Sequence, residues 1–381
     1  MRIVVSGGGR FHLFELALQL QKREHLARLI TSYPARRATA VGIEPGKVTS
    51  IVSKEIVFRG GKLLPRFLRF GQDPQYLSCE LFDRRARGLL PECDIFAGLS
   101  SFSLKTLRRA RRRGAVTVLE RGSTHILFQQ QILREEYERF GLSFRGAHPR
   151  IVDKELQEYE ESDRIFVPSH FARQTFRDRG IAAEKVAVLP YGVDLDIFQP
   201  GSGREDGIFR VIFCGKLNLQ KGVHYLLRAF SELNLPGSEL LLIGRCSPEF
   251  SPFLDEYEGA FNWIGPQPRD RLPAYFRRGT VFVLDSIQEG MALVQLEAMA
   301  SGLPLICSTN TGGEDLIENG EEGFVIPIRN LDALKEKILF FYENRSRARR
   351  MGMKARRKVG RGFSWSDYGE RIVDYYKTML R

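Results

Sequence analysis

The stretch IFRVIFCGKLNLQKGVHYLLRAFSEL, residues 208–233, decides the fold class. An apolar run leads into a glycine turn at Gly215, and apolar residues at helical spacing follow Gly222, so the stretch predicts a strand, a turn and an amphipathic helix. The N-terminus repeats this order, with RIVVSGGG at 2–9 followed by FHLFELALQLQKRE at 11–24. The same strand–turn–helix unit therefore begins each half of the chain.

Further strand candidates follow both units. In the first half they are LARLITSY (26–33), CDIFAGLS (93–100), AVTVLER (115–121) and RIFVPS (164–169), with SLKTLRRARRRG (103–114) and IVDKELQEYEESD (151–163) as helices. In the second half they are ELLLIGR (239–245), TVFVLDS (280–286), PLICSTN (304–310) and GFVIPI (323–328). Strands that alternate with helices predict parallel sheets, in which ligands bind at the carboxyl ends of the strands. We expect an α/β protein with two Rossmann-like parallel-sheet domains facing a central cleft.

The best linker candidate is VLPYGVDLDIFQPGSGREDG (188–207), which is rich in Gly, Pro and Asp. The end of the chain, GFSWSDYGERIVDYYKTMLR (362–381), starts with a Ser/Asp cap signal and continues as an amphipathic helix. We therefore expect domains at 1–195 and 196–362, followed by a terminal helix at 363–381. Residues 42–75 do not fit this scheme, and their basic segment KLLPRFLRFG (62–71) suits either a surface excursion or a membrane contact.

The chain is basic, with a net charge of +12 to which the runs RRARRR (108–113) and SRARRMGMKARRKVGR (346–361) contribute. Such a charge favours polyanionic partners, although a solvated helix face is the simpler explanation of each run. Aromatic residues, which a nucleic-acid platform would need, are missing from both runs, so we expect no nucleic-acid partner. Peripheral contact with an anionic membrane, or an anionic substrate, stays open.

Cysteine usage and hydropathy bear on location. The cysteines are odd in number, scattered and without metal-ligand spacing: Cys79, Cys93, Cys214, Cys246 and Cys307. They predict reduced thiols in a cytosolic protein. No apolar run approaches the roughly 18 residues of a membrane span, and the N-terminus predicts a strand, not a signal peptide. We expect a cytoplasmic protein, with a peripheral position on the inner face of the membrane as the alternative.

Both glycine turns are candidate anion sites. In the first, Gly7 and Gly9 fit the dinucleotide pattern G-x-G-x-x-G, but His12 stands at its third glycine. This turn either packs a strand tightly against a helix or offers backbone N–H groups to an anion. In the second, Lys216 and Lys221 flank a glycine turn at a helix N-terminus and suit a diphosphate, with solvated lysines as the alternative.

Two carboxylates interrupt the mostly apolar stretch SIQEGMALVQLEAMASGLPLI, residues 286–306. A helix is expected at about 292–301, with Glu289 on the loop before it and Glu297 on its apolar surface. A lone buried glutamate usually caps a helix or pairs with a basic residue. Two glutamates beside a helix N-terminus favour a site for a polyol phosphate, because carboxylates accept bonds from hydroxyls and N–H groups bind phosphate.

The E-x7-E spacing in EGMALVQLEAMASGLPLI strongly resembles the signature of retaining glycosyltransferases of family 4, which have the GT-B fold. Other segments match in the same order: LPYGVDLDIFQP (189–200), GKLNLQKG (215–222), WIGPQPRDRLPAYFRRGTVFVLDS (263–286) and TGGEDLIENGEEGFVIP (311–327). The resemblance covers residues 164–381 well and 1–160 loosely. It implies that the terminal helix after FSW crosses back to the N-terminal domain.

By resemblance, the protein moves a hexose from a nucleotide-diphosphate sugar, a UDP- or GDP-sugar, to a glycan, lipid-linked or other small hydroxyl acceptor in polysaccharide or glycoconjugate synthesis. Retention in this class is described as attack on the front face of the sugar with the leaving phosphate as base, so no protein nucleophile is implied. The implied catalytic residues are His125, Glu289, Lys216 and Lys221. The implied donor-binding residues are Gly215, Lys216, Lys221, Ile264, Glu289, Gly290, Met291, Ala292, Leu293 and Glu297, and those of the acceptor side are Gly8, Gly9, His12 and Arg121.

The same resemblance implies a role for each group. The lysines neutralise the diphosphate, Glu297 holds the ribose hydroxyls, and Glu289 holds the donor sugar beside the N–H groups of residues 290–293. The backbone of Ile264 lies by the base, and His125 lies near the anomeric carbon, although a purely structural histidine is the alternative. The pair Asp194 and Asp196 fits the interdomain segment, not a metal motif, and we expect no metal and no cofactor besides the donor.

The sequence departs from the family pattern in three places. Ala292 stands where a glycine is frequent, Lys216 stands where arginine is common, and IGRCSPEF (243–250) lacks the usual glycine pair. Because of these departures, the sequence does not indicate which nucleotide base and which sugar the donor carries. A nucleotide-sugar epimerase of the same fold is the alternative enzyme, and a non-catalytic protein that binds nucleic acid or membrane through its charge is the alternative of another class.

Overall fold

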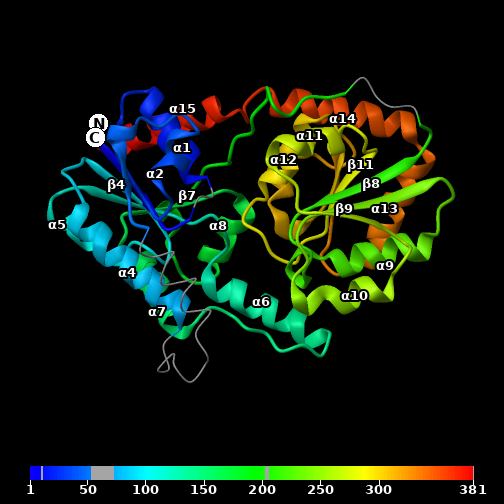
Figure 1. The fold of residues 1–381 in the computed structure, drawn as a ribbon, viewed down its shortest axis with the longest axis horizontal. Helices are drawn as coiled ribbons and strands as arrows, with labels where there is room; N and C mark the ends of the chain where they lie inside the picture. The colour runs from blue at the N-terminus through cyan, green and yellow to red at the C-terminus, as the bar shows by residue number, and fades with distance from the viewer. Residues whose placement is uncertain (10–11, 53–72, 202–205, 381) are drawn as a thin grey trace.

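Two parallel β-sheets, one in each half of the chain, form the framework of the molecule (Figure 1). The computed structural model describes residues 1–9, 12–52, 73–201 and 206–380. The expected α/β architecture with two Rossmann-like sheets is confirmed. The predicted boundary at 195/196 falls between the last strand of the first sheet, which ends at Val188, and the first strand of the second, which begins at Phe209. The segment KLLPRFLRFG lies outside the described residues.

The first sheet has the strand order β3-β2-β1-β4-β5-β6-β7, with every pair parallel. Its strands are β1 (Ile3–Gly7), β2 (Leu26–Thr31), β3 (Val48–Ser50), β4 (Ile95–Leu99), β5 (Val116–Glu120), β6 (Arg164–Val167) and β7 (Val186–Val188). Its helices are α1 (Leu13–Lys22), α2 (Ala35–Thr39), α4 (Pro74–Leu89), α5 (Leu104–Arg112), α6 (Ile126–Arg139), α7 (Pro149–Glu161) and α8 (His170–Arg177), with short turns η1 (Pro45–Lys47) and η3 (Ala183–Lys185). The central strands β1 and β4 are wholly buried, as expected of parallel strands that helices cover on both faces.

The second sheet has the order β10-β9-β8-β11-β12-β13 and is also parallel. Its strands are β8 (Phe209–Cys214), β9 (Ser238–Ile243), β10 (Asn262–Gly265), β11 (Val281–Leu284), β12 (Leu305–Ser308) and β13 (Gly323–Ile326). Its helices are α9 (Val223–Leu233), α10 (Ser251–Glu256), α11 (Leu272–Phe276), α12 (Leu293–Ala300), α13 (Leu331–Glu343) and α14 (Arg345–Val359), with turns η4 (Leu219–Lys221), η5 (Pro248–Phe250), η6 (Arg269–Arg271), η7 (Thr309–Thr311) and η8 (Gly313–Asp315). In each sheet the strand order reverses next to the first strand, between β1 and β4 in the first sheet and between β8 and β11 in the second. Sheets of this kind bind ligands at this position.

The terminal helix α15 (Trp365–Met379) returns to the first half of the chain and packs on α1, so both termini lie at the same end of the molecule (Figure 1). Ser364 and Asp367 form a capping box that starts the helix, as the cap signal predicts. The ring of Tyr376 stacks on Phe166 of β6, with centroids 5.7 Å apart. This helix therefore ties the end of the second half to the first sheet.

The basic side chains of both runs are exposed or half-buried, and some of them also bond to the rest of the protein. In the first run, Arg108 Nε donates to Glu161 Oε2 at 2.8 Å, and Arg113 donates to the carbonyl of Leu90 at 2.9 Å. In the second run, Arg356 donates to the carbonyl of Phe198 at 2.9 Å. Within the described residues, no helix is long and apolar enough to cross a bilayer.

Candidate active site

The second glycine turn and the loop after β11 are brought together by a close backbone approach. We call residues 215–222 the lysine turn and residues 285–292 the donor loop. Gly222 has φ +67°, and a Cβ atom built on it would lie 1.7 Å from the carbonyl oxygen of Asp285, so only glycine fits. The amide of Ile287 also donates to the carbonyl of Gln220 at 2.8 Å. Because β8 and β11 are neighbouring strands, both segments lie at the same sheet edge.

The consequence is an ion pair between Lys221 and Glu289. Their side chains are 18% and 15% exposed, so the pair is largely shielded from water. Lys216 lies at the other end of the lysine turn with an exposed side chain that makes no ion pair within the described part of the chain. The structure therefore brings Lys221 of the lysine turn into contact with Glu289 of the donor loop.

Glu297 lies on α12 and is also paired. Arg269 Nε, from η6, donates to Glu297 Oε1 at 2.9 Å, and the carboxylate side chain is 9% exposed. Burial raises the pKa of Glu297, while the charge and hydrogen bond of Arg269 act in the opposite direction. Sequence reasoning missed Arg269, although it stands in the quoted segment WIGPQPRDRL.

The N-terminus of α12 faces the same region without a side-chain cap, because Ala292 occupies the N-cap position. An uncapped helix start leaves backbone N–H groups for an anion or for water. The amide of Glu289 donates to the carbonyl of Asn310 at 2.9 Å, which fixes the loop ahead of the helix. Met291 and Ala292 are buried and Leu293 is half-buried, so this part of the donor loop is already packed.

The base end of the predicted site is built from glycines. A Cβ on Gly244, at the end of β9, would lie 1.7 Å from the carbonyl oxygen of Gly215. Ile264 lies on β10 and is half-buried, while the neighbouring Trp263 is 45% exposed and donates from Nε1 to the Gly244 carbonyl at 2.8 Å. Gly244 therefore allows the backbones that follow β8 and β9 to touch.

The first half of the chain touches the donor loop through residues that the sequence did not single out. Gln288 Nε2 donates to Thr124 Oγ1 at 2.7 Å and to Ser123 Oγ at 2.9 Å. Ser169 Oγ donates to the carbonyl of Gly290 at 2.5 Å. A Cβ on Gly290 would lie 2.5 Å from the carbonyl oxygen of Gly122, so the loop after β5 and the donor loop lie in close contact. Local sequence motifs do not indicate these contacts, because each joins residues more than 100 positions apart.

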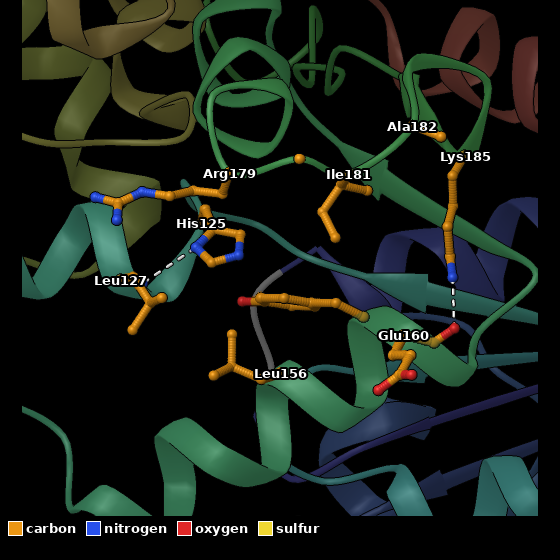
Figure 2. Close-up of a pocket in the computed structure, with 10 residues that line it drawn as sticks. His125, Leu127, Leu156, Glu160, Arg179, Ile181, Ala182 and Lys185 are labelled. Atoms are coloured by element: carbon orange, nitrogen blue, oxygen red, sulfur yellow. Dashed lines mark hydrogen bonds between the residues drawn. The ribbon is translucent and has the colours of Figure 1, made fainter.

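His125 lies beside Thr124 in the sequence, but its ring faces elsewhere. The ring is 2% exposed, and its centroid is 5.0 Å from those of Tyr159 and Phe176. It lines a cavity of about 470 Å³ whose walls all belong to the first half of the chain (Figure 2). Nδ1 accepts the N–H of Leu127 at 3.2 Å, and burial, reinforced by the charges of Arg121 and Arg179, lowers the pKa of the ring to about 4.

The predicted acceptor-side residues are mostly internal. His12 Nε2 lies 2.8 Å from Glu120 Oε2, and its ring is 4.6 Å from that of Tyr191, so it is part of a buried cluster. Arg121 pairs with Glu155 at 3.0 Å and donates from Nε to the Thr124 carbonyl at 3.0 Å, which fixes the loop after β5.

The glycines and aspartates of the prediction have structural neighbours of their own. Gly8 is buried and packs against the ring of Phe102, and Gly9 is half-buried. The Asp194 carboxylate accepts the N–H groups of Asp196 and Ile197 at 3.1 and 3.0 Å, which makes it a turn cap. The structure thus brings Lys221 and Glu289 into contact, whereas His12, Arg121 and Gly8 are buried within the first half of the chain.

Comparison with known proteins identifies the family. The model described as Glycosyltransferase Family 4 matches residues 6–197, half of the chain, and that of Glycosyl transferases group 1 matches residues 196–358. The D-inositol 3-phosphate glycosyltransferase of Nocardia farcinica is 28% identical over 261 residues, which are 62% of this chain and 57% of that protein. The UDP-Gal:alpha-D-GlcNAc-diphosphoundecaprenol alpha-1,3-galactosyltransferase of Escherichia coli is 29% identical over 219 residues, 51% of this chain and 55% of that protein. The chain spans about three fifths of the length of the curated relatives it matches.

Solved structures share the whole fold. Sucrose-phosphate synthase from Thermosynechococcus elongatus superposes with a TM-score of 0.78 at 18% identity, covering 100% of this chain and 99% of that one. Alr3699/HepE from Anabaena in complex with UDP-glucose gives 0.71 at 16% identity, covering 99% of this chain and 100% of that one. At such identities the likeness concerns the fold, and the family follows from the sequence matches. The chain belongs to glycosyltransferase family 4.

Proposed function

We propose that the chain transfers a sugar, with retention of its anomeric configuration, from a UDP- or GDP-sugar to a hydroxyl of a glycan or lipid-linked acceptor in polysaccharide or glycoconjugate synthesis. The observation that carries the proposal is the meeting of Lys221 with Glu289 at the ends of neighbouring strands. A nucleotide-sugar has a diphosphate and a hydroxyl-rich ring side by side. A lysine and a carboxylate in contact suit those two groups.

The relatives support the choice of donor and acceptor. The name of the Escherichia coli relative gives a UDP-galactose donor and a diphosphoundecaprenol-linked sugar as acceptor, and one solved structure of the same fold holds UDP-glucose. A UDP-sugar and a polyprenyl-linked sugar are therefore the first pair to test for this chain.

In the proposed reaction, an acceptor hydroxyl attacks the anomeric carbon while the bond from that carbon to the diphosphate oxygen breaks. The hydroxyl proton passes to the leaving phosphate oxygen, and a nucleoside diphosphate departs. Negative charge grows on the diphosphate during this step, and Lys216, Lys221 and the N-terminal end of α12 stabilise it. Attack from the face that the diphosphate leaves gives retention without a protein nucleophile.

The remaining donor groups hold the substrate in place for this step. Glu289 accepts hydroxyl hydrogens of the sugar beside the amides of residues 290–293, Glu297 accepts those of the ribose, and the backbone of Ile264 borders the base. We expect the loop after β5 to cover the sugar from the acceptor side, with Thr124 in contact with the donor loop. A direct contact between His125 and the sugar would require its ring to leave the cavity that it lines.

A lipid-linked acceptor would bring the protein to the inner face of the membrane. Exposed arginines on the adjoining helices α4 and α5, including Arg84, Arg85, Arg87 and Arg112, suit anionic headgroups there. We therefore propose cytoplasmic action with peripheral membrane contact, and no part for nucleic acid.

The test is a donor screen with the purified chain. Thermal shift against UDP, GDP and their sugars should identify a nucleotide that stabilises the folded state. That donor is then incubated with an undecaprenyl-diphosphate-linked sugar, and release of the nucleoside diphosphate is followed together with the anomeric proton of the product. Retained configuration in an acceptor-dependent product supports the proposal. Release of an epimerised sugar without acceptor would instead identify the epimerase, and absence of nucleotide binding would contradict both.

A further inference from the structure

The carboxylate of Glu297 is covered from the solvent side by one cation. The side chain of Glu297 is 9% exposed and that of Arg269 is 41% exposed, with Nε of Arg269 2.9 Å from Oε1. The guanidinium carbon also lies 5.5 Å from the ring centroid of Phe198, in the segment that joins the two sheets. Arg269 is therefore held between an aromatic ring and the carboxylate, a geometry that a guanidinium suits better than an ammonium.

The charge on Glu297 depends on this contact. A buried carboxylate without a partner is costly and takes up a proton instead. Burial raises the pKa of Glu297, and the charge and hydrogen bond of Arg269 lower it. Cys214, at the end of β8, also faces Glu297, and burial raises the pKa of its thiol to about 12, so it stays uncharged. Within the described residues, Arg269 is the cation recorded against this carboxylate.

We propose that Arg269 is a positioning residue of the donor site, which keeps Glu297 ionised and oriented to accept both ribose hydroxyls of the nucleotide. The inference rests on the proposed function, since it takes Glu297 to be the ribose ligand. The recorded hydrogen bond engages Oε1, which leaves Oε2 for the ribose. An ionised carboxylate accepts from both hydroxyls of a diol, whereas a protonated one must use one oxygen as a donor. Hydrogen bonds to the charged form are also about twice as strong.

The decisive experiment measures nucleotide affinity against pH. We would titrate UDP and GDP by calorimetry into the wild-type protein, R269M, R269K and R269M/E297Q between about pH 5.5 and 9. For R269M we expect affinity roughly tenfold below wild type near pH 6, with a gap that closes toward pH 9 as Glu297 ionises. R269K should keep part of the affinity. R269M/E297Q should bind weakly and without the pH dependence, because the titrating group is gone.

The matched control is R271A, which removes an exposed arginine from the same turn and should leave both affinity and pH profile unchanged. Thermal unfolding of each variant checks that the fold is kept. Equal affinity and an equal pH profile for R269M and wild type would overturn the inference, and so would a loss of the same size at every pH. If wild type binds neither nucleotide, the proposed function fails before any variant is compared, and the inference falls with it.

Discussion

Lys221 and Glu289 stand 68 positions apart in the sequence and form an ion pair in the structure. The pair joins a group suited to phosphate with a group suited to sugar hydroxyls, so each neutralises the other before a donor arrives. A diphosphate that binds Lys221 would take over this cation and leave Glu289 free to accept hydroxyl hydrogens. In the proposed reaction, binding of the diphosphate would thereby prepare Glu289 to bind the sugar.

Replacement of the two partners should therefore have opposite effects on binding. In E289A the lysine is released, so UDP or GDP should bind at least as well as in wild type, while transfer falls by a factor of about 100 or more. In K221M nucleoside diphosphate affinity should fall by about tenfold or more, with a smaller loss for the monophosphate. Calorimetry and a turnover assay separate the two outcomes. Normal turnover in E289A would contradict the assignment of this site.

The close approach at Gly222 predicts a second pair of variants. G222A puts a Cβ at φ +67° and within 1.7 Å of the Asp285 carbonyl oxygen, so the lysine turn must move away from the donor loop. We expect lower stability and loss of most activity. G237A is the matched control, because Gly237 has φ +63° but no atom within 4 Å of the added Cβ. G237A should lower the free energy of unfolding by about 1–2 kcal/mol, the cost of the backbone strain alone, and leave turnover unchanged. Equal activity in both variants would show that the close approach does not matter.

The strands of the two sheets were largely predictable, because parallel strands that are buried on both faces appear as short apolar runs. The edge strands β3, β7 and β10, of three or four residues each, were not predicted, since so few residues carry no periodic pattern. Helix α6 was also missed, although it begins at a cap that His125 itself provides. The terminal helix was predicted because its capping box is a local signal.

The residues proposed for the donor site were named from the sequence because most of them lie within two short segments of recognisable spacing, 215–221 and 289–297. The partner of Glu297 was not, because Arg269 precedes it by 28 residues and reaches it only through the sheet topology. The orientation of the loop after β5 was not predictable either. Thr124 and His125 are adjacent in the sequence, but Thr124 contacts the donor loop and His125 lines the cavity in the first half of the chain. Sequence spacing locates residues at a sheet edge, and packing decides which side chain faces the ligand.

The buried ring of His125 predicts a dependence of stability on acid. Its pKa in the folded state is about 4, below the value of 6.5 in an unfolded chain, so between these values the unfolded state binds more protons. Stability should therefore fall as pH drops from 6.5 to 4, by about 2 kcal/mol after allowance for solvent in the cavity. Urea denaturation should show this slope in wild type and a flatter one in H125F.

Two comparisons complete this test. His148 also caps a helix by accepting an N–H two residues on, at 3.2 Å, so H148F controls for the lost cap at a half-buried position. At neutral pH the ring of His125 is uncharged and faces the cavity, so we expect H125F to reduce turnover by less than tenfold. A loss as large as that of E289A would show that the ring reaches the sugar during the reaction.

Metal removal provides a further check. The proposed reaction assigns the diphosphate charge to Lys216 and Lys221, so turnover should be unchanged by EDTA and by added Mg²⁺ or Mn²⁺. Activity measured after dialysis against EDTA tests this directly. A loss that a divalent cation restores would contradict the proposed charge assignment, and K216M would then be expected to have little effect on binding.

Asp285, the first residue of the donor loop, predicts a stability effect of opposite sign to that of His125. Its carboxyl oxygens are buried without a hydrogen-bond partner in the described residues, and burial, then the charge of Glu136, raises its pKa well above 3.8. Above about pH 4 the folded state thus holds a proton that the unfolded state has lost, so this group costs stability as pH rises. D285N should be more stable than wild type at pH 7, with a gap in the free energy of unfolding that widens as the pH rises above about 4.

The contrast is a buried aspartate that does have partners. Asp83 is fully buried and accepts the N–H groups of Lys105 and Thr106 at 2.9 Å, and Lys154 lies 2.7 Å from Oδ2. D83N should destabilise the protein, because it removes one of the two carboxylates that pair with the buried Lys154, the other being Glu80. Urea denaturation of both variants at pH 5 and pH 8 compares a lone acid with a paired one. If D285N and wild type have the same free energy of unfolding at both pH values, Asp285 does not hold an extra proton in the folded protein. That result would contradict the description of Asp285 as a buried carboxyl without a partner.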